Sequence, residues 1–392
     1  MSKRNDYRLL TVFAFSIVLT FGIIMNLKAQ VNPLIQDYYG INYSRLGLIF
    51  STLSTGSIIT TFYGGRLIQN FGLKKVIFSG LSVVGVGLAV VNYSITYNLL
   101  LVAMFIIGLG LGLLNVSNNS LASLLFVKNR GRMMNIFHLF FGVGGMLAPI
   151  YANGLFNLGG NWKSTYFFVL LIIIPLLMVT FKAKFPKLER DKKEPTSFFK
   201  LLGEPKILIF ALIFLLYVGL EIGIASWLGV YLNDVQGRSE GEIGFYLAIF
   251  FFLFTFGRLV ASFIVEKVGY FKMVFISATL GGLSFFLGLV GPEVFTIFFS
   301  MVGLWIAPIF PTMQAIIFET FEEDISAIIG LILTFGALGD VIIANWFTGL
   351  LNDLLGIRLG YGGFLVYIVL LIFLLNWLRV GYLNQDKVKA SN

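Results

Sequence analysis

The sequence predicts an all-α membrane protein whose twelve transmembrane helices form two six-helix halves. Three observations predict this fold: the composition, the number of long apolar segments and an internal repeat. Apolar residues make up 58% of the 392-residue chain and charged residues only 12%, against about 25% charged residues in soluble proteins. A soluble fold cannot bury so much apolar surface and still cover its outside with polar groups. The composition therefore excludes a soluble enzyme, a nucleic-acid-binding protein and a disordered chain.

Twelve segments are long enough to cross a bilayer, which takes about 20 apolar residues for a helix. The basic stretch Met1–Arg8 precedes an apolar run that is too long for a cleaved signal, so we expect this run to be retained as the first span. A charged loop at 182–206 is predicted to link an N-terminal bundle, 1–181, to a C-terminal bundle, 207–392. The expected spans are 9–35, 46–63, 76–93, 99–126, 133–155, 164–181, 207–232, 243–265, 273–290, 295–318, 326–351 and 362–379.

The positions of the lysine and arginine residues predict the orientation. If the N-terminus lies inside, only Arg45, Lys163, Arg238 and Arg358 of the 28 basic residues fall in outer loops. Basic residues are enriched in cytoplasmic loops, so we expect a multi-pass protein of the cell inner (plasma) membrane with both termini in the cytoplasm. This distribution also accounts for the net charge of +9. The inner turn at Glu319–Asp324 is acidic instead, and acidic residues contribute little to orientation.

Several kinds of chemistry are excluded by missing residue types. The chain has no cysteine and a single histidine, which excludes disulfides, thiolate catalysis, iron–sulfur clusters and multi-histidine metal sites. No Gly-Lys-Ser/Thr phosphate-binding loop is present, so ATP is not expected to drive the protein. We therefore predict that the protein is not an enzyme and uses no cofactor or metal. Its energy must come from an ion gradient or from the gradient of its own substrate.

Two pairs of similar segments indicate an internal duplication. The segment Ile68–Lys75 resembles Val265–Lys272, and Phe141–Gly145 resembles Phe335–Gly339, in both cases about half the chain length apart. Repeats of like topology, related by an axis along the membrane normal, are typical of a large class of transporters that bind substrate between their halves. The glycines of Gly108–Gly112 are predicted to let helix backbones approach closely.

The turn after the second span carries a family resemblance. Gly64–Lys75 resembles the signature loop of the major facilitator superfamily, with Gln69 where the family usually has Asp. Three stretches narrow the resemblance to the fucose:proton symporter family, particularly its glucose/mannose-type branch: Asn135–Gly142, Tyr217–Trp227 and Ala307–Thr312. The resemblance implies the major facilitator fold, in which spans one, four, seven and ten line a central cavity. The missing Asp implies weaker charge interactions of this loop at the inner face of the membrane.

One departure from the family affects coupling. Fucose carriers have an acidic residue in span one and another at the start of a Glu-Thr-Ala-Ala-Asn pattern in span four. This chain has Asn115 in place of the second acid, keeps the final Asn119, and has no acid in Met25–Gln30. Proton coupling through those two positions is therefore not expected here.

The amides within the spans form two groups. Asn115, Asn118 and Asn119 share one face of the fourth span, and Asn26 and Gln30 share a face of the first. Amides both donate and accept hydrogen bonds, as sugar hydroxyls do, so an amide cluster in a cavity predicts a site for a neutral polyol. The alternative is contact between helices, worth about 0.6 kcal/mol for each hydrogen bond.

Four further residues complete the predicted substrate-binding set. The indole of Trp227 is suited to stack on a pyranose ring, although aromatic residues near helix ends are also interface anchors. His138 is predicted to bind the sugar, with packing and proton relay as alternatives. Lys28 and Gln314 are the remaining members of the set.

Four charged residues within the spans should pair, because isolated ions in a bilayer are costly. They are Lys28, Glu221, Arg258 and Asp340. The repeat places Lys28 about one turn from the position equivalent to Glu221, so the two are expected to face each other across the cavity. Glu221 and Asp340 are the candidate proton carriers, with a static ion pair as the alternative. Arg258 is expected to be structural, near the inner gate.

These observations predict a secondary active transporter that imports a monosaccharide, a hexose such as glucose, by proton symport and alternating access. Its expected partners are the sugar, protons or sodium ions, and the lipid bilayer, with no nucleic acid, and it is expected to be a monomer. The alternative is a proton-driven efflux transporter of amphipathic molecules, which the 42 phenylalanines keep open. A non-transporting sensor is a third possibility, against which the lack of a sizeable loop argues. Amides and acids lining the cavity would favour the sugar, whereas phenylalanine and methionine would favour efflux.

Overall fold

The computed structural model describes residues 2–126, 130–186, 201–321 and 325–391. Within these residues, 12 helical segments are long and apolar enough to cross a membrane. Each overlaps one of the twelve segments expected from the sequence, so the prediction of a multi-pass, all-α membrane protein is confirmed. Several helices extend beyond the apolar stretch that predicted them: the first span continues to Tyr39 rather than ending near residue 35.

The residues separate by their mutual contacts into two units. The first comprises Met1–Lys192 together with Arg238–Ala248, and the second comprises Lys193–Gly237 and Ile249–Asn392. The division at 192 falls inside the predicted linker, of which residues 187–200 lie outside the described part of the chain. The predicted domain limits at 181 and 207 stay a prediction.

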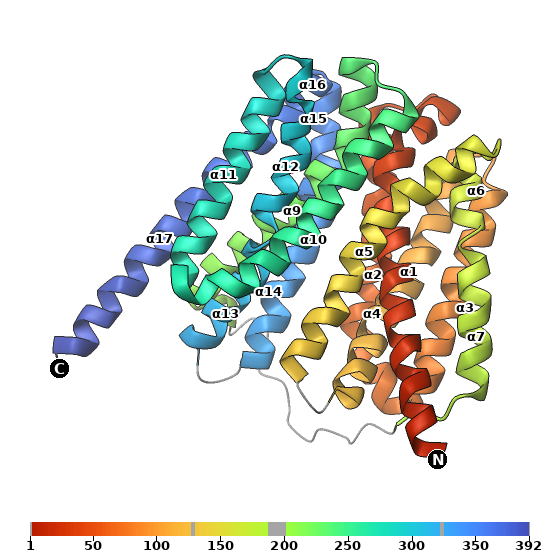
Figure 1. Cartoon of the computed structure of the whole chain (residues 1–392), viewed down its shortest axis with the longest axis horizontal. Helices are drawn as coiled ribbons and strands as arrows, with labels where there is room; N and C mark the ends of the chain where they lie inside the picture. Colours follow the sequence, from red (N-terminus) through yellow and green to blue (C-terminus); the bar gives the residue numbers. More distant parts are fainter. Residues whose placement is uncertain (1, 127–129, 187–200, 322–324, 392) are drawn as a thin grey trace. The chain divides into compact units, whose positions relative to one another are not determined.

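Among the described residues, the first unit contains seven whole helices (Figure 1) and the start of the helix that begins at Glu240. The short α6 and α7 together make the sixth span. The seven whole helices are α1 (Ser2–Tyr39), α2 (Tyr43–Phe71), α3 (Leu73–Asn92), α4 (Tyr97–Leu125), α5 (Arg130–Asn157), α6 (Trp162–Phe167) and α7 (Leu170–Lys182). In this unit α1 packs on α5, α2 and α3 pack on α4, and α7 packs on α3.

The second unit repeats this packing scheme. Here α9 packs on α14, α11 on α12, and α17 on α11. Its elements are α9 (Pro205–Gln236), α10 (Glu240–Val268), α11 (Tyr270–Val290), η1 (Glu293–Thr296), α12 (Ile297–Ile306), α13 (Ile309–Thr320), α14 (Ile325–Gly339), the π-helical η2 (Asp340–Phe347), α15 (Thr348–Leu355), α16 (Ile357–Gly362) and α17 (Phe364–Ser391).

Glycines at equivalent helix crossings relate the two units residue by residue. A Cβ at Gly144 of α5 would overlap the Leu19 carbonyl oxygen of α1, and a Cβ at Gly339 of α14 would overlap the Leu215 carbonyl oxygen of α9. These two pairs lie 195 to 196 residues apart in the sequence (144 to 339, 19 to 215). The close approach requires glycine, because any side chain would clash with backbone.

A second pair of crossings repeats in the same way. A Cβ at Gly108 of α4 would overlap the Leu53 carbonyl oxygen of α2, and a Cβ at Gly303 of α12 would overlap the Phe250 carbonyl oxygen of α10. The close approach predicted for Gly108 is therefore observed. Together, the two repeated crossings support the duplication inferred from the sequence.

The turn between α2 and α3 shows what the signature loop does in this chain. Gly72 closes it with a φ of 85°, and Gly269 closes the equivalent turn between α10 and α11 with a φ of 88°. Lys74 then reaches the end of α7, where its Nζ donates to the carbonyl oxygens of Phe181 at 2.8 Å and Ala183 at 3.1 Å. A lysine at a helix C-terminus satisfies free carbonyls and complements the helix dipole.

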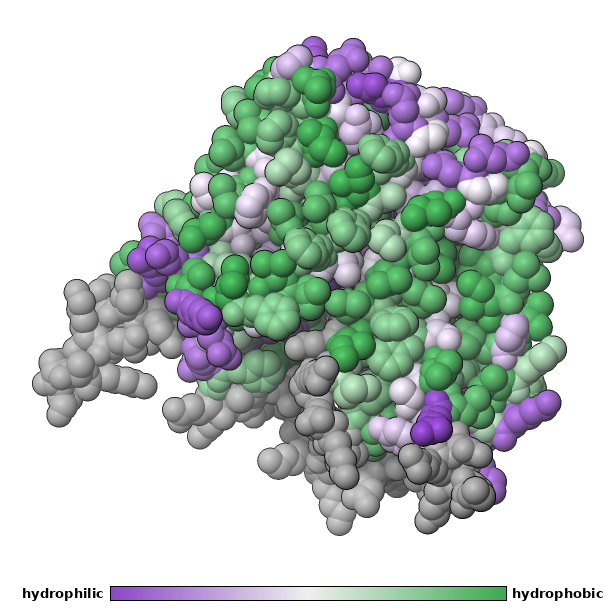
Figure 2. All heavy atoms as spheres, viewed as in Figure 1, coloured by the Kyte–Doolittle hydropathy of each residue, from purple (hydrophilic) through white to green (hydrophobic). Residues whose placement is uncertain are grey.

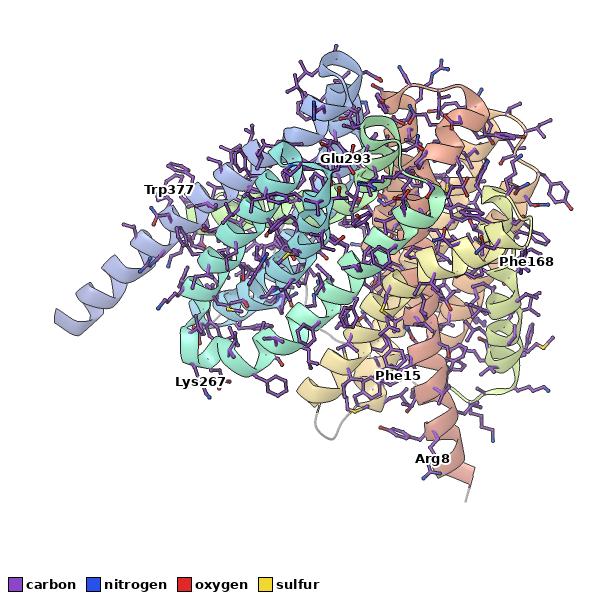
Figure 3. The ribbon with its side chains drawn as sticks, turned by 45° about the horizontal axis from the view of Figure 1, so that its top comes forward. Arg8, Phe15, Phe168, Lys267, Glu293 and Trp377 are labelled. Atoms are coloured by element: carbon purple, nitrogen blue, oxygen red, sulfur yellow. The ribbon has the colours of Figure 1, made fainter. Side chains whose placement is uncertain are left out.

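The surface agrees with a membrane environment. Figure 2 shows apolar side chains over the middle of the helices and hydrophilic side chains gathered toward their ends. In Figure 3, Arg8 lies at the start of α1, whereas Lys267 and Glu293 lie at opposite ends of the second unit. Large apolar side chains such as Phe263, which is 72% exposed, lie on the surface of the helices, as expected where lipid replaces water.

Candidate functional site

A cavity of about 70 Å³ in the first unit contains the predicted amides. It lies between α1, α4 and α5. Four of its residues were predicted to bind substrate, namely three asparagines and the histidine of the chain. The lining residues are Ile17, Val18, Phe21, Leu114, Asn115, Asn118, Asn119, Phe137, His138 and Phe141.

The helical period of α4 brings the three asparagines to one face. Asn118 is 3% exposed, and its Nδ2 donates to the Ala14 carbonyl oxygen of α1 at 3.0 Å. The Oδ1 of Asn118 has no hydrogen-bond partner among the described residues. A buried, unpaired amide oxygen costs about 1 to 3 kcal/mol, so the cavity presents a strong acceptor to any hydroxyl that enters it.

The two other asparagines are linked to each other. Asn119 Nδ2 donates to the Oδ1 of Asn115 at 3.0 Å and to its carbonyl oxygen at 2.7 Å. This fixes the Asn115 side chain with its own amide nitrogen available as a donor. His138, which is exposed, lies on α5 in the wall of the same cavity.

The apolar wall of the cavity consists mainly of aromatic and branched side chains. Phe21 and Phe141 have ring centroids 5.8 Å apart, and Phe137 is 1% exposed. Amides on one wall and rings on another suit a ligand with polar edges and an apolar face, as a pyranose has.

The amides of span one do not line this cavity. Asn26 Nδ2 donates to the Gly22 carbonyl oxygen of its own helix at 2.8 Å. Gln30 is 2% exposed, and its Nε2 donates to Asn153 Oδ1 at 3.1 Å and to the Glu240 carbonyl oxygen at 2.9 Å. Gln30 thus joins α1 to α5 and to Glu240, which belongs to the first unit, and this favours the alternative of helix contact for Gln30.

Lys28 is buried next to an aromatic ring. It is 5% exposed, and its Nζ lies 5.5 Å from the centroid of the Phe50 ring. Its predicted position opposite Glu221 involves a residue of the other unit and stays a prediction.

In the second unit, Glu221 is paired with Arg258. The Arg258 Nη2 lies 3.3 Å from Glu221 Oε1, a partner that the sequence did not suggest because 37 residues separate the two. The guanidinium also lies 4.3 Å from the centroid of the Phe254 ring, and its Nε donates to the Ala307 carbonyl oxygen at 3.4 Å.

A break in span ten explains why these groups meet. Between α12 and α13 the chain leaves the helix at Ala307 and Pro308. Proline has no N–H, so Pro311 leaves the Ala307 carbonyl without its usual partner four residues on. Arg258 satisfies that carbonyl, and the Tyr217 hydroxyl donates to the neighbouring Ile306 carbonyl at 3.1 Å. The prediction that Arg258 is structural agrees with this arrangement.

Trp227 and Gln314 lie elsewhere in the second unit. Trp227 is 2% exposed, and its Nε1 donates to the Ala344 carbonyl oxygen at 2.7 Å. This bond occupies the polar edge of the indole, so only its face remains for the predicted stacking. Gln314 is partly exposed on α13, and in the repeat it corresponds to Asn119 (119 to 314).

Asp340 begins the π-helical segment of span eleven. It is 6% exposed, and Asn345 Nδ2 donates to its Oδ1 at 2.9 Å and to its carbonyl oxygen at 2.8 Å. The Thr348 hydroxyl makes an equivalent bond to the Ile343 carbonyl, also five residues back. Such segments are frequent at functional sites, and no sequence pattern indicated this one.

Two features of the sequence analysis are not described by the structure. They are the side chain of Asn135 and the acidic residues at 322–324. Among the residues that are described, no group of three or more His, Asp or Glu side chains is placed to hold a metal ion.

Twelve membrane spans, two units with repeated helix crossings and a polar cavity inside a helix bundle define a polytopic membrane transporter. Residues 10–239 and 236–391 match the family model of the Major Facilitator Superfamily. The chain belongs to this superfamily, as its signature loop suggested.

Similar proteins occur in a yeast and in bacteria. The chain is 24% identical to "Bypass of stop codon protein 6" of Saccharomyces cerevisiae, over 91% of this chain and 79% of that protein. It is 21% identical to the TsgA homolog of Buchnera aphidicola subsp. Schizaphis graminum, over 87% and 88% of the two chains.

Solved structures share the fold. The nucleoside transporter NupG has a TM-score of 0.77 at 14% identity, over 95% of this chain and 99% of that chain. A variant of the E. coli fucose:proton symporter FucP has a TM-score of 0.65 at 19% identity, over the same shares of the two chains. The superfamily prediction is thus confirmed, while the glucose/mannose-type branch stays a prediction.

Proposed function

We propose that this protein is a secondary transporter that imports a monosaccharide, a hexose such as glucose, in symport with protons and by alternating access. One observation carries the substrate class: the buried Oδ1 of Asn118, without a partner among the described residues, in a cavity also lined by Asn115, Asn119 and His138.

The chemistry of this wall supports a polyol. A sugar hydroxyl that donates to Asn118 Oδ1 removes the cost of the unpaired oxygen, and the same hydroxyl accepts from a neighbouring amide. A ligand without that hydroxyl leaves the amides unpaired, which gives the site its selectivity. The cavity within the first unit has a volume of about 70 Å³, enough for a few water molecules, so we infer that these residues hold one edge of the sugar.

Proton coupling is proposed for Glu221 and Asp340. Protonation of Glu221 removes the charge that holds Arg258, whose guanidinium also binds the Ala307 carbonyl at the break in span ten. A change of charge at Glu221 therefore reaches the junction of α12 and α13 directly. Asp340 has a comparable position, because its carboxylate accepts from Asn345 inside a π-helical segment.

Uptake of labelled hexoses into proteoliposomes tests the substrate class. We expect accumulation of at least one hexose when the outside is acidic, and only equilibration without a pH gradient. Nucleosides and a cationic amphipathic dye belong in the same assay. Uptake of a nucleoside but no hexose would refute the sugar and indicate a nucleoside substrate. Proton-driven export of the dye would instead support the efflux alternative, which the six apolar lining residues of the cavity favour.

We also propose that the protein lies in the inner (plasma) membrane of the cell, with both termini in the cytoplasm, and that it is a monomer. The chain has no cysteine, so single cysteines report orientation directly. A cysteine replacing Leu158, which is 85% exposed, should react with an impermeant maleimide from outside the cell. A cysteine replacing the exposed Lys75 should react only after the membrane is opened.

A further inference from the structure

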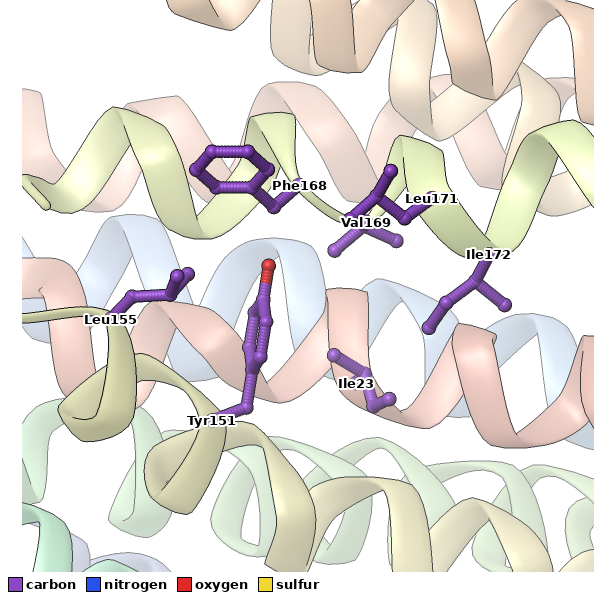
Figure 4. Close-up of a pocket in the computed structure, with 7 residues that line it drawn as sticks. All are labelled: Ile23, Tyr151, Leu155, Phe168, Val169, Leu171 and Ile172. Carbon is purple, nitrogen blue, oxygen red and sulfur yellow. The ribbon is translucent and has the colours of Figure 1, made fainter. Parts of the chain in front are cut away.

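A second cavity in the first unit is apolar and lies apart from the amides. Its volume is about 400 Å³. Figure 4 shows side chains of α1 and α5, including Ile23 and Leu155, facing those at the junction of α6 and α7, including Phe168 and Ile172. The sixth span is broken at Phe168 and Val169, and both residues line the cavity.

This cavity opens to the lipid side and offers no free polar group. Leu171 at its rim is 68% exposed and Phe168 is 42% exposed. The only side-chain oxygen in its wall, that of Tyr151, donates its proton to the Thr165 carbonyl at 3.0 Å. A hydrocarbon chain is the ligand that fits such a lining.

An unusual cation lies at the start of the same helix. Lys163 is 8% exposed, its Nζ donates to the Tyr38 hydroxyl at 2.8 Å, and it lies 4.2 Å from the centroid of the Tyr38 ring. Among the described residues no carboxylate pairs with it. Tyr38 is 50% exposed, and because its oxygen accepts from Lys163, its own proton is available to an anion outside. The pair therefore presents a positively polarised donor at the protein surface.

The spacing along the helix relates the cation to the cavity. Phe168 and Ile172 follow Lys163 by five and nine residues, which is about 8 and 14 Å along a helix. Half of the hydrocarbon core of a bilayer is about 15 Å thick. The span that contains these residues begins at Trp162, so Lys163 lies where the helix enters the membrane and the cavity extends through one leaflet.

We propose that the first unit holds one anionic phospholipid, with the headgroup phosphate on the Tyr38 hydroxyl beside the Lys163 ammonium and one acyl chain in the apolar cavity. The site is separate from the amide cavity and does not depend on the identity of the transported substrate. Charge complementarity selects the anionic headgroup, because a zwitterionic lipid also carries a cation that Lys163 repels.

Native mass spectrometry of the delipidated full chain, titrated with phosphatidylglycerol and with phosphatidylcholine of the same acyl chains, tests the proposal. We expect one tightly retained phosphatidylglycerol, with about tenfold preference over phosphatidylcholine. Tyr38→Phe removes the hydroxyl, which is the donor to the phosphate and the acceptor of the Lys163 ammonium, and should abolish this preference while the protein stays folded. Leu171→Trp fills the cavity from its rim and should lower retention of both lipids several-fold.

Matched variants separate the site from general lipid contact. Tyr63→Phe, Arg45→Gln and Leu283→Trp change a tyrosine, a basic residue and a leucine at surface positions away from the cavity, and each should retain lipid as the unmodified chain does. The proposal is overturned if Tyr38→Phe keeps the preference for phosphatidylglycerol, or if Leu283→Trp reduces retention as much as Leu171→Trp. Lys163→Gln removes the cation and should also lose the preference for phosphatidylglycerol. An equal loss in Arg45→Gln would overturn the proposal, since the effect would then depend on net charge alone.

Discussion

Replacing Asn118 with leucine separates substrate binding from helix packing, because the two roles predict different magnitudes. The side chain makes one hydrogen bond, to the Ala14 carbonyl oxygen at 3.0 Å, and bonds of this kind between membrane helices contribute about 0.6 kcal/mol. A hydroxyl of the substrate on Oδ1 contributes more, because without it a buried acceptor stays unpaired, at a cost of about 1 to 3 kcal/mol. We therefore expect little loss of stability, because the variant also removes the buried unpaired oxygen, and a loss of affinity of about 5- to 150-fold.

The assay measures both quantities on the same preparations. Binding or half-saturation of hexose uptake gives the affinity, and thermal unfolding in detergent gives the stability. Asn153→Leu is the matched control, since Asn153 also makes an interhelical amide hydrogen bond in the first unit, to Gln30 at 3.1 Å, but does not line the cavity. If Asn118→Leu alters affinity by less than twofold while it unfolds at a lower temperature, Asn118 is a packing residue and the substrate argument fails.

Three further outcomes follow from the second unit. Glu221→Gln and Asp340→Asn should each abolish accumulation against a gradient while leaving exchange of substrate intact, and accumulation by both variants would refute their role in coupling. Arg258→Gln leaves Glu221 without its partner at 3.3 Å and the Ala307 carbonyl oxygen without its donor at 3.4 Å, so the variant should unfold at a lower temperature; an unchanged unfolding temperature would count against the pair. Gly339→Ala places a methyl group against a backbone carbonyl, which should cost about 1 to 3 kcal/mol of stability, whereas Gly330→Ala, with open space around it, should unfold at the unchanged temperature.

The spans were predictable because the bilayer imposes a length and an apolar composition on every helix that crosses it. The breaks within spans were harder to predict from the sequence. Pro308 marks the break in span ten, but span six breaks at Phe168 without a proline, while Pro175 and Pro149 lie inside helices. A break of this kind depends on tertiary packing around the helix, to which local sequence patterns are insensitive.

Within the predicted site, helical periodicity alone determines which residues of one helix lie close together. Asn115 and Asn118 lie close together because they share a face of one helix, and their separation by three residues predicts this. The pair of Glu221 and Arg258 joins two helices, and it depends on a carbonyl that Pro311 leaves without a partner. The need of this carbonyl for a hydrogen-bond donor is visible in the sequence, but the donor can be identified only once the neighbouring helices are known.

The repeat also shows how the duplicated halves have diverged. The helix crossings at glycine are present in both units, and they determine which residue of one unit corresponds to which residue of the other. Asn115 and Asn118 of α4 correspond to Phe310 and Met313 of α13, while Glu221 of α9 corresponds to Met25 of α1. Packing at the crossings has therefore been retained while the polar groups have separated. The first unit carries neutral amides suited to hold a polyol, and the second carries the acids suited to bind a proton, so substrate recognition and coupling are expected to respond to mutations in different halves.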